Sequence, residues 1–130
     1  MAPGAKQGDS VVGTDIHIIM IPSPGGPVPT PLPHPFAGKI TGGCSTDVMI
    51  GGMPAAVVGS TATNVPPHIP QGGPFQSPPT NDGTVQMGSM TVKINGKSAA
   101  RAGDPVKTCN DPTPAPTSSI VAVGTVMIGG

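Results

Sequence analysis

Short apolar runs broken by glycine and proline dominate this chain and predict β-strands joined by tight turns. The longest run, residues 16–21, is rich in isoleucine and contains His17 near its start. One strand-and-turn phrase occurs three times, as Val48-Met49-Ile50-Gly51-Gly52, Val92-Lys93-Ile94-Asn95-Gly96 and Val126-Met127-Ile128-Gly129-Gly130. Gly-Gly and Asn-Gly supply the positive φ that a two-residue hairpin turn requires. Each phrase therefore predicts a short hairpin.

The phrases belong to longer repeats, which we place at residues 40–60, 85–104 and 120–130. Residues 53–60 align with residues 97–104 well beyond the strand and its turn. Three equivalent units in one chain predict a body with approximate threefold symmetry. We expect a single domain over residues 1–130, with residues 1–10 as an N-terminal arm.

Proline-rich stretches separate the repeats. Seven prolines lie between positions 22 and 35, and further groups occupy residues 64–82 and 112–116. Such stretches exclude helix and offer few amide donors to a sheet, so they predict extended, semi-rigid straps. No segment has a sustained helical period. The fold class predicted is an all-β body of hairpins with proline-rich straps and little or no helix.

The composition indicates a folded chain with a thin core. Glycine and proline number 20 and 19 of 130 residues, yet charged residues are only 9%, whereas disordered chains are usually highly charged. Aromatic residues are 2%, and we expect Met49, Met87, Met90 and Met127 to serve as core filler. A small fold with so little apolar volume commonly needs a disulfide or a metal. Zero net charge and few aromatic residues argue against a nucleic-acid partner.

The N-terminus lacks the apolar run of a signal peptide, so we expect synthesis in the cytoplasm without secretory export. A reducing compartment favours a metal over a Cys44–Cys109 disulfide, although both remain open. Cys109 is the better candidate ligand, because Cys44 lies within a repeat strand where a free cysteine packs as a small apolar residue. Arg101 and Asp104 could pair, support a ligand or be solvated, and we favour a structural role.

The three histidines, His17, His34 and His68, each lie in a separate segment. One such histidine alone is more often exposed or hydrogen-bonded than a ligand. Three histidines with one cysteine nevertheless form an acceptable tetrahedral set for structural zinc. The metal would join segments where few side chains fill the core, and its binding would add folding free energy there.

Two phrases resemble the proline-alanine-alanine-arginine (PAAR) repeat family, the spike-tip proteins of type VI secretion and related contractile injection systems. They are Gly-Met-Pro-Ala-Ala-Val-Val-Gly and Gly-Lys-Ser-Ala-Ala-Arg-Ala-Gly-Asp-Pro-Val-Lys-Thr-Cys, and the resemblance runs from about residue 8 to residue 130. Ser98 stands where the family usually has proline, and Val57 and Ser60 stand where arginine and aspartate are usual. The proline straps resemble the variant found on extracellular phage-tail-like particles.

The resemblance implies a short cone of β-hairpins with pseudo-threefold symmetry and a metal near its point. It implies zinc, rather than iron, bound by His17, His34, His68 and Cys109. His17 and Cys109 match the family by their spacing from the Gly-Asp pairs, whereas His34 and His68 match only by lying in the straps. The cone's base would sit on the blunt end of a trimeric β-helical spike protein. We expect the base to be built from Val48, Ile50, Val92, Ile94, Val126 and Ile128.

The function expected is a non-enzymatic tip that caps and sharpens the spike and helps it to breach a target membrane. The chain ends after the third repeat, so effector proteins would be separate cargo. The tip would be assembled into the injection particle and delivered outside the cell or into target cells. Two alternatives are a zinc hydrolase that uses the histidine cluster and an adaptor that binds through its proline straps. The chain has no glutamate, which weakens the hydrolase alternative because catalytic zinc normally needs a nearby general base.

Overall fold

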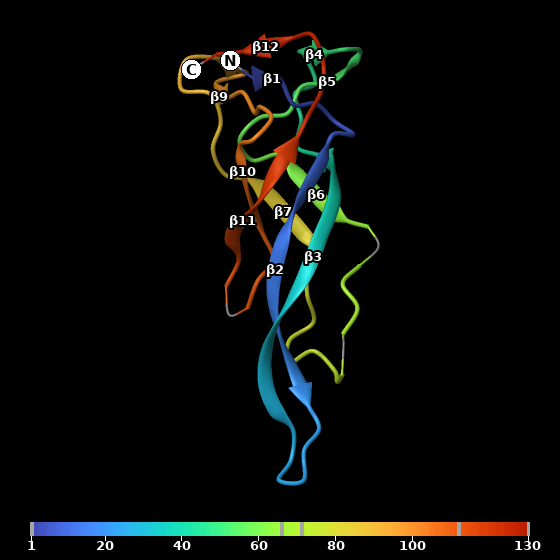
Figure 1. Cartoon of the computed structure of the whole chain (residues 1–130). Helices are drawn as coiled ribbons and strands as arrows, with labels where there is room; N and C mark the ends of the chain where they lie inside the picture. The colour runs from blue at the N-terminus through green and yellow to red at the C-terminus, as the bar shows by residue number, and fades with distance from the viewer. Residues whose placement is uncertain (1, 66, 71, 112, 130) are drawn as a thin grey trace.

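The computed structural model describes residues 2–65, 67–70, 72–111 and 113–129. Six strands close into a barrel in the order β10-β11-β2-β3-β6-β7 (Figure 1). Their bounds are β2 Ser10–Ile21, β3 Val28–Gly42, β6 Thr61–Asn64, β7 Asp82–Val85, β10 Pro105–Thr108 and β11 Ala115–Val121. The described residues form no helix, and therefore none able to cross a bilayer. The all-β prediction is confirmed.

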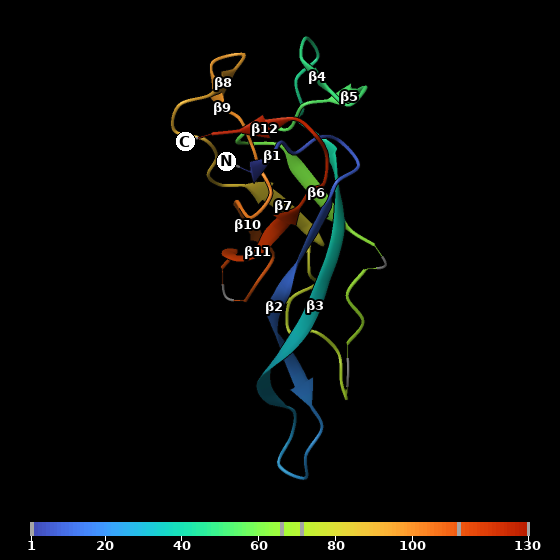
Figure 2. The same cartoon turned by 45° about the horizontal axis from the view of Figure 1, so that its top comes forward.

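Three small two-stranded sheets stand together at one end of the barrel, which we call the base (Figure 2). They pair β4 Met49–Ile50 with β5 Met53–Pro54, β8 Lys93–Ile94 with β9 Lys97–Ser98, and β12 Met127–Ile128 with β1 Ala2–Pro3. Gly51 and Asn95 begin the first two turns with φ of 57° and 53°. The three predicted strand-and-turn phrases thus form the base of the molecule.

The third of these sheets uses the N-terminus. Ala2 and Pro3 pair with Ile128 and Met127, which corrects the expectation of an arm over residues 1–10. Residues 2–9 repeat the path of residues 53–60 and 97–104, although Gly4 and Lys6 stand where the second repeat has alanine and arginine. The chain therefore closes its threefold arrangement by bringing its two ends to one sheet.

A ring of backbone hydrogen bonds fixes the threefold arrangement. Ala5 N–H donates to the carbonyl of Ala100, Ala100 N–H to that of Ala56, and Ala56 N–H to that of Ala5, at 2.9, 3.0 and 3.0 Å. All three alanines are fully buried. A larger side chain at these positions would fill the space in which the three segments meet. The repeated alanine is therefore required by the close approach of three backbones.

The base has its own small core, in which Ile50, Ile94 and Ile128 are 8%, 7% and 5% exposed. A Cβ atom on Gly4 would lie 2.9 Å from Cδ1 of Ile128, so glycine fits here where the other repeats have alanine. These isoleucines were expected to meet a partner directly. Their burial shows that their side chains pack the three small sheets against one another.

The exposed apolar side chains of the base belong to the neighbours of these isoleucines. Val48 and Val126 are 37% and 43% exposed, and Met49 and Met127 are 57% and 49% exposed. Met87 and Met90 are exposed as well. The expectation that these four methionines fill the core is therefore wrong. The core instead uses alanine, valine and isoleucine around the single buried phenylalanine of its cluster, Phe36.

Away from the base, β2 and β3 continue past the barrel as a long hairpin whose turn lies at the opposite end of the molecule (Figure 1). Four prolines of the expected strap, Pro29, Pro31, Pro33 and Pro35, alternate along β3 and are paired with β2. The paired segment differs from the unpaired strap that we expected. Proline is tolerated in an edge strand when its nitrogen faces away from the neighbouring strand. The backbone groups of Ile16, Ile18 and Met20 on β2 point away from β3 and bond to the segments around Pro74 and Asp111. The β3 prolines opposite these residues therefore do not have to donate a hydrogen bond to β2.

The alanine ring gives a direct test of the threefold core. Ala56→Leu and Ala100→Leu are each expected to lower the free energy of unfolding by about 1–3 kcal/mol, because overpacking a filled site forces backbone shifts. Ala37→Leu, at an exposed position of β3, is the matched control and should change it by less than about 0.5 kcal/mol. Denaturant unfolding measures these differences, and equal effects at buried and exposed positions would contradict a close-packed ring.

Candidate metal centre

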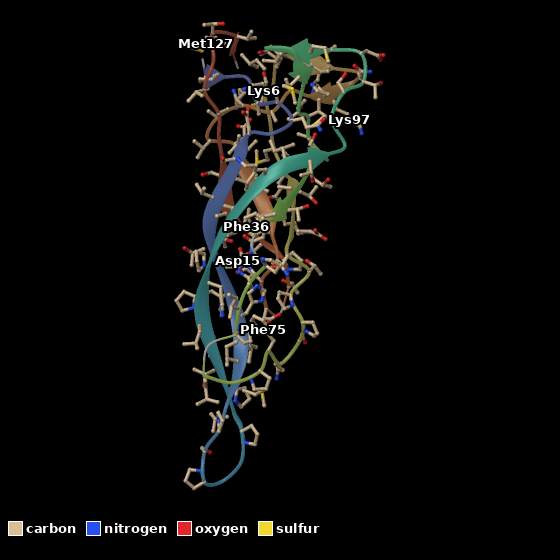
Figure 3. All side chains as sticks on the ribbon, turned by 90° about the vertical axis from the view of Figure 1, so that its right-hand side faces the viewer. Lys6, Asp15, Phe36, Phe75, Lys97 and Met127 are labelled. Carbon is tan, nitrogen blue, oxygen red and sulfur yellow. The ribbon has the colours of Figure 1, made fainter. Side chains whose placement is uncertain are left out.

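The site lies at the narrow end of the barrel, where the long hairpin leaves it (Figures 1 and 3). Side chains alternate between the two faces of a strand, so Asp15 and His17 of β2 both point inward and both are buried. On β3, His34 lies directly opposite Asp15 and points inward as well. The pairing of β2 with β3 thus brings two of the predicted ligands to one point.

His68 and Cys109 reach the same point from the far side of the barrel. His68 follows β6, and its backbone N–H donates to the side-chain oxygen of Asn81 at 2.8 Å. Cys109 follows β10 directly, and its N–H donates to the carbonyl of Asp82 at 3.2 Å. Residues 81 and 82 therefore position both ligands, which is how two distant segments converge.

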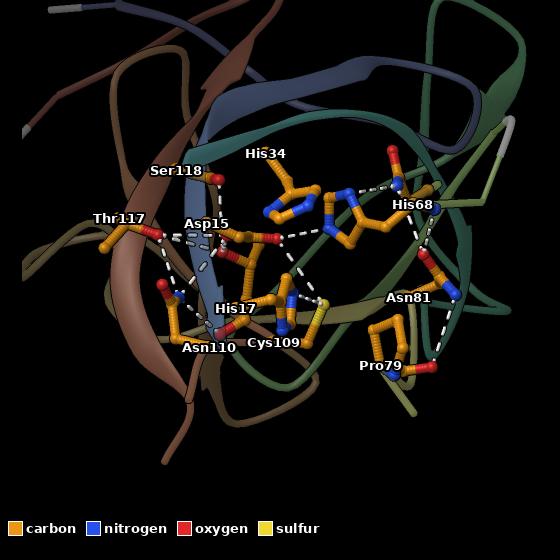
Figure 4. Close-up of polar contacts among 12 residues, drawn as sticks. Asp15, His17, His34, His68, Pro79, Asn81, Cys109, Asn110, Thr117 and Ser118 are labelled. Carbon is orange, nitrogen blue, oxygen red and sulfur yellow. Dashed lines mark hydrogen bonds and ion pairs between the residues drawn. The ribbon is translucent and has the colours of Figure 1, made fainter. Parts of the chain in front are cut away.

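The four predicted ligands form one cluster (Figure 4). The ring centroids of His17 and His68 are 4.8 Å apart, and His34 lies 5.5 and 5.6 Å from them. Cys109 Sγ is 3.6 Å from His17 Nε2. Donor atoms of Asp15, His17, His68 and Cys109 all lie within 4.8 Å of one another, so this buried group could hold a metal ion.

Asp15 is the member that the sequence interpretation missed. Its side chain is fully buried, and Oδ2 lies 2.9 Å from His68 Nε2 and 3.4 Å from Cys109 Sγ (Figure 4). The signal was available, because an aspartate two residues before a histidine in a strand shares its face. Residue type alone, histidine or cysteine, does not reveal this shared face.

Hydrogen bonds identify the proton-bearing nitrogen on two of the rings. His34 Nδ1 lies 3.0 Å from the carbonyl oxygen of Leu32, which only accepts, so neutral His34 keeps its Nε2 lone pair free. Asn64 accepts from Ala37 N–H through Oδ1, and this directs its NH2 group to His68 Nδ1 at 3.3 Å. Neutral His68 therefore bears its proton on Nε2 and donates it to Asp15.

Burial keeps two of the candidate ligands uncharged. It lowers the pKa of His17, with the charge of His68 as the next cause, so His17 is a neutral imidazole at pH 7. Burial, followed by the negative charge of Asp15, raises the pKa of the Cys109 thiol to about 11. A neutral imidazole can bind a metal at once, whereas the thiol must first lose its proton.

Two buried nitrogens support the fit of a metal. Within the described part of the chain, His17 Nδ1 and His34 Nε2 have no hydrogen-bond partner, and His17 Nδ1 lies 3.6 Å from Asp111 Oδ2. Native structures rarely leave buried polar atoms unpaired. Imidazole nitrogens and a thiol are also the donors that zinc prefers. The residues present therefore fit a bound transition metal such as zinc.

The structure also answers two other sequence predictions, the Cys44–Cys109 disulfide and the role of Arg101 and Asp104. Cys44 and Cys109 are both free thiols, so the disulfide alternative is not formed. Arg101 pairs with Asp104 at 3.0 Å, and Asp104 also accepts from Arg101 N–H at 2.7 Å. Lys6 and Asp9 make the equivalent contacts in the N-terminal repeat. The structural role expected for Arg101 and Asp104 is confirmed, and it recurs with the threefold pattern.

Zinc uptake is expected to release a proton from Cys109. The thiol is protonated below its pKa of about 11, and a bound zinc ion displaces that proton, so apparent affinity should rise with pH from 7 to 9. Calorimetry in two buffers of different ionisation enthalpy gives the proton count. Cys109→Ser should release about one proton fewer per zinc than the natural chain, while Cys44→Ser should not differ from it. An unchanged count in Cys109→Ser would remove this thiol from the site.

The comparisons with known proteins agree with this geometry over part of the chain. Residues 76–130, which include the second and third repeats and Cys109, match the family model described as PAAR motif. No curated protein matches the chain. The resemblance seen in the sequence is thereby confirmed, and the chain carries a PAAR motif within an all-β, threefold-repeated body.

Proposed function

We propose that this protein is the tip of the central spike of a contractile injection apparatus, where it caps and sharpens a trimeric β-helical spike protein. The threefold base is the observation that supports this proposal most strongly. A single chain presents three equivalent two-stranded sheets at one end, two of them hairpins and the third formed by the two chain ends, closed by the ring of Ala5, Ala56 and Ala100. Each sheet can then meet one subunit of a true trimer.

The contact surface consists of the exposed side chains beside the buried isoleucines. The segments that contain β4 and β12 present Val48, Met49, Val126 and Met127, and Met127 lies at the outer end of the base in Figure 3. Methionine adapts its shape to a partner surface. Ile50, Ile94 and Ile128 support this surface from behind, and Val92 packs against the same core.

The opposite end is the leading end in this proposal. Twelve residue pairs hold β2 against β3, and the segment at Phe75 pairs with Ile19 on the free side of β2. Strand pairing on both sides stiffens the projecting hairpin, and its prolines discourage another chain from pairing with the edge of β3. A stiff, narrow end suits brief contact with a target membrane during puncture.

A zinc ion would be held by His17, His68 and Cys109, with His34 as the fourth ligand given by the family resemblance. When bound, zinc would join four segments into one rigid centre. The side chains that would bind it come from β2, β3, the segment after β6 and the residue after β10. The ion would thus lie where the hairpin leaves the barrel, the position at which a load on the hairpin would bend it.

Co-expression tests the proposal. The tagged chain and the trimeric spike protein of the same injection system should elute together in size-exclusion chromatography and remain together through affinity purification. A proline-rich adaptor would bind without a folded base, so the Ala100→Leu variant separates the two functions at a temperature where it is unfolded and the natural chain is folded. Retained spike binding by the unfolded variant at that temperature would contradict capping by the threefold base.

A further inference from the structure

Asp15 has no place in the ligand set implied by the family resemblance, yet it is the most buried charged group at the site. Among the described residues, no lysine or arginine pairs with it. The lysine and arginine ion pairs are Lys6–Asp9 and Arg101–Asp104, both in the repeats next to the base. A buried carboxylate is normally paired with a cation or coordinates a metal. Its surroundings therefore point to a cation.

The two carboxylate oxygens of Asp15 have different environments. Oδ1 accepts from the hydroxyl groups of Thr108 and Thr117, the latter at 3.1 Å, and from Asn110 Nδ2 at 3.4 Å. Oδ2 meets only candidate metal ligands, His68 and Cys109. One oxygen is thus fixed by the protein, and the other is directed at the centre of the cluster.

We propose that Asp15 is the counter-charge of the metal, holding a negative oxygen against the site so that a divalent ion leaves the buried centre electrically neutral. This rests on the proposed metal site. Zinc contributes two positive charges, and the Cys109 thiolate that forms when the thiol proton passes to the buffer contributes one negative charge. Three neutral imidazoles add none. The Asp15 carboxylate supplies the second negative charge. Because it lies close to the site in a low-dielectric interior, its electrostatic attraction for the ion is strong.

This role predicts selectivity by ion charge. With Asp15 present, a divalent ion gives a neutral centre and a monovalent ion leaves one excess negative charge. In Asp15→Asn the preference reverses, because a monovalent ion together with the thiolate then gives a centre of zero net charge. Zn2+ and Cu+ are suitable probes, since both accept cysteine and histidine ligands.

The experiment measures Zn2+ and, without oxygen, Cu+ affinities by competition with chromophoric chelators. Asp15→Asn should weaken Zn2+ binding by about 10–100-fold, the usual cost of losing a partner of the ligands, and leave Cu+ affinity unchanged or higher. Asp104→Asn is the matched control, since it also removes a buried carboxylate. It should leave the ratio of the two affinities unchanged. A merely structural role of Asp15 would weaken both ions equally, and this result, or no change in either, would overturn the proposal.

Folding of the variant does not limit the test. If metal-free Asp15→Asn does not fold, refolding yields with Zn2+ and with Cu+ replace the affinities. Recovery with Cu+ alone would support the counter-charge, whereas equal recovery, or none with either ion, would overturn it. A natural chain that binds neither ion would instead remove the metal site itself. Spike binding is measured separately by co-elution, so failure of Asp15 and failure of the proposed function remain distinguishable.

Discussion

Chelating the metal from the natural protein is expected to lower its melting temperature by about 10–20 °C. A ligand at about 1,000 times its dissociation constant stabilises the folded state by about 4 kcal/mol, and 1 kcal/mol moves the melting temperature of a chain this size by about 3–5 °C. The effect is large here because the cluster joins four segments at an end of the barrel where the core is polar. Differential scanning calorimetry with zinc and with excess chelator measures the shift.

Single ligand variants should reproduce this loss. His68→Ala is expected to lower zinc content and melting temperature together, because it removes a candidate metal ligand and the hydrogen bond from His68 to Oδ2 of Asp15. Cys109→Ser should behave in the same way. Cys44→Ser, which alters the other free thiol outside the site, is the control. If His68→Ala keeps both zinc and melting temperature, His68 does not bind the metal.

Placing charge on the base is expected to abolish attachment to the spike. Met49→Asp combined with Met127→Asp puts two carboxylates on exposed apolar positions of two different sheets of the base, and each would be desolvated without a partner in a packed interface. We expect affinity for the trimeric spike protein to fall by more than about 100-fold, since buried unpaired charges cost several kcal/mol. Biolayer interferometry on the immobilised spike measures it.

Both methionines are exposed, so the double variant should keep its fold and its melting temperature. Val65→Asp, at a 66% exposed position just after β6, is the matched control and should bind normally. Charged substitution of the buried Ile94 would confuse loss of folding with loss of binding. Normal spike binding by the methionine variant would place the contact surface elsewhere.

The repeats and the candidate ligand cluster could be predicted because each left a local signal. Three copies of a strand and a glycine turn predicted three hairpins; the first two copies form hairpins, whereas the third pairs with the N-terminal residues instead. The scarcity of histidine and cysteine made His17, His34, His68 and Cys109 the candidate ligands. Donor atoms of His17, His68 and Cys109 come together with Asp15, and the His34 ring lies beside them. These features depend on residue type and spacing, which a sequence shows directly.

The closure of the third repeat depends on long-range pairing and was missed. Ala2 and Pro3 pair with residues more than a hundred positions away, and Gly4 departs from the repeated alanine because the Ile128 side chain fills the space. The pairing of Pro29 to Pro35 was missed for a related reason. Proline content alone predicts an unpaired strap, whereas the period of two from Pro29 to Pro35 places the nitrogens of these prolines away from β2 and permits pairing.

Asp15 shows a third limit. Aspartate is common, so its type alone did not mark it as part of the site. Only the closure of the barrel brings Thr108 and Thr117 to one of its oxygens and His68 to the other. The candidate site was thus predictable in its rare residues but not in the common polar residues that surround them.

Native mass spectrometry of the chain with its trimeric spike protein tests the central claim most directly. A single chain with three equivalent sheets at its base should bind as one copy per three spike subunits, and its mass should include one metal ion that acidification removes. A complex with three copies of this chain per trimer, or no complex at all, would contradict an account in which internal repetition matches a threefold partner.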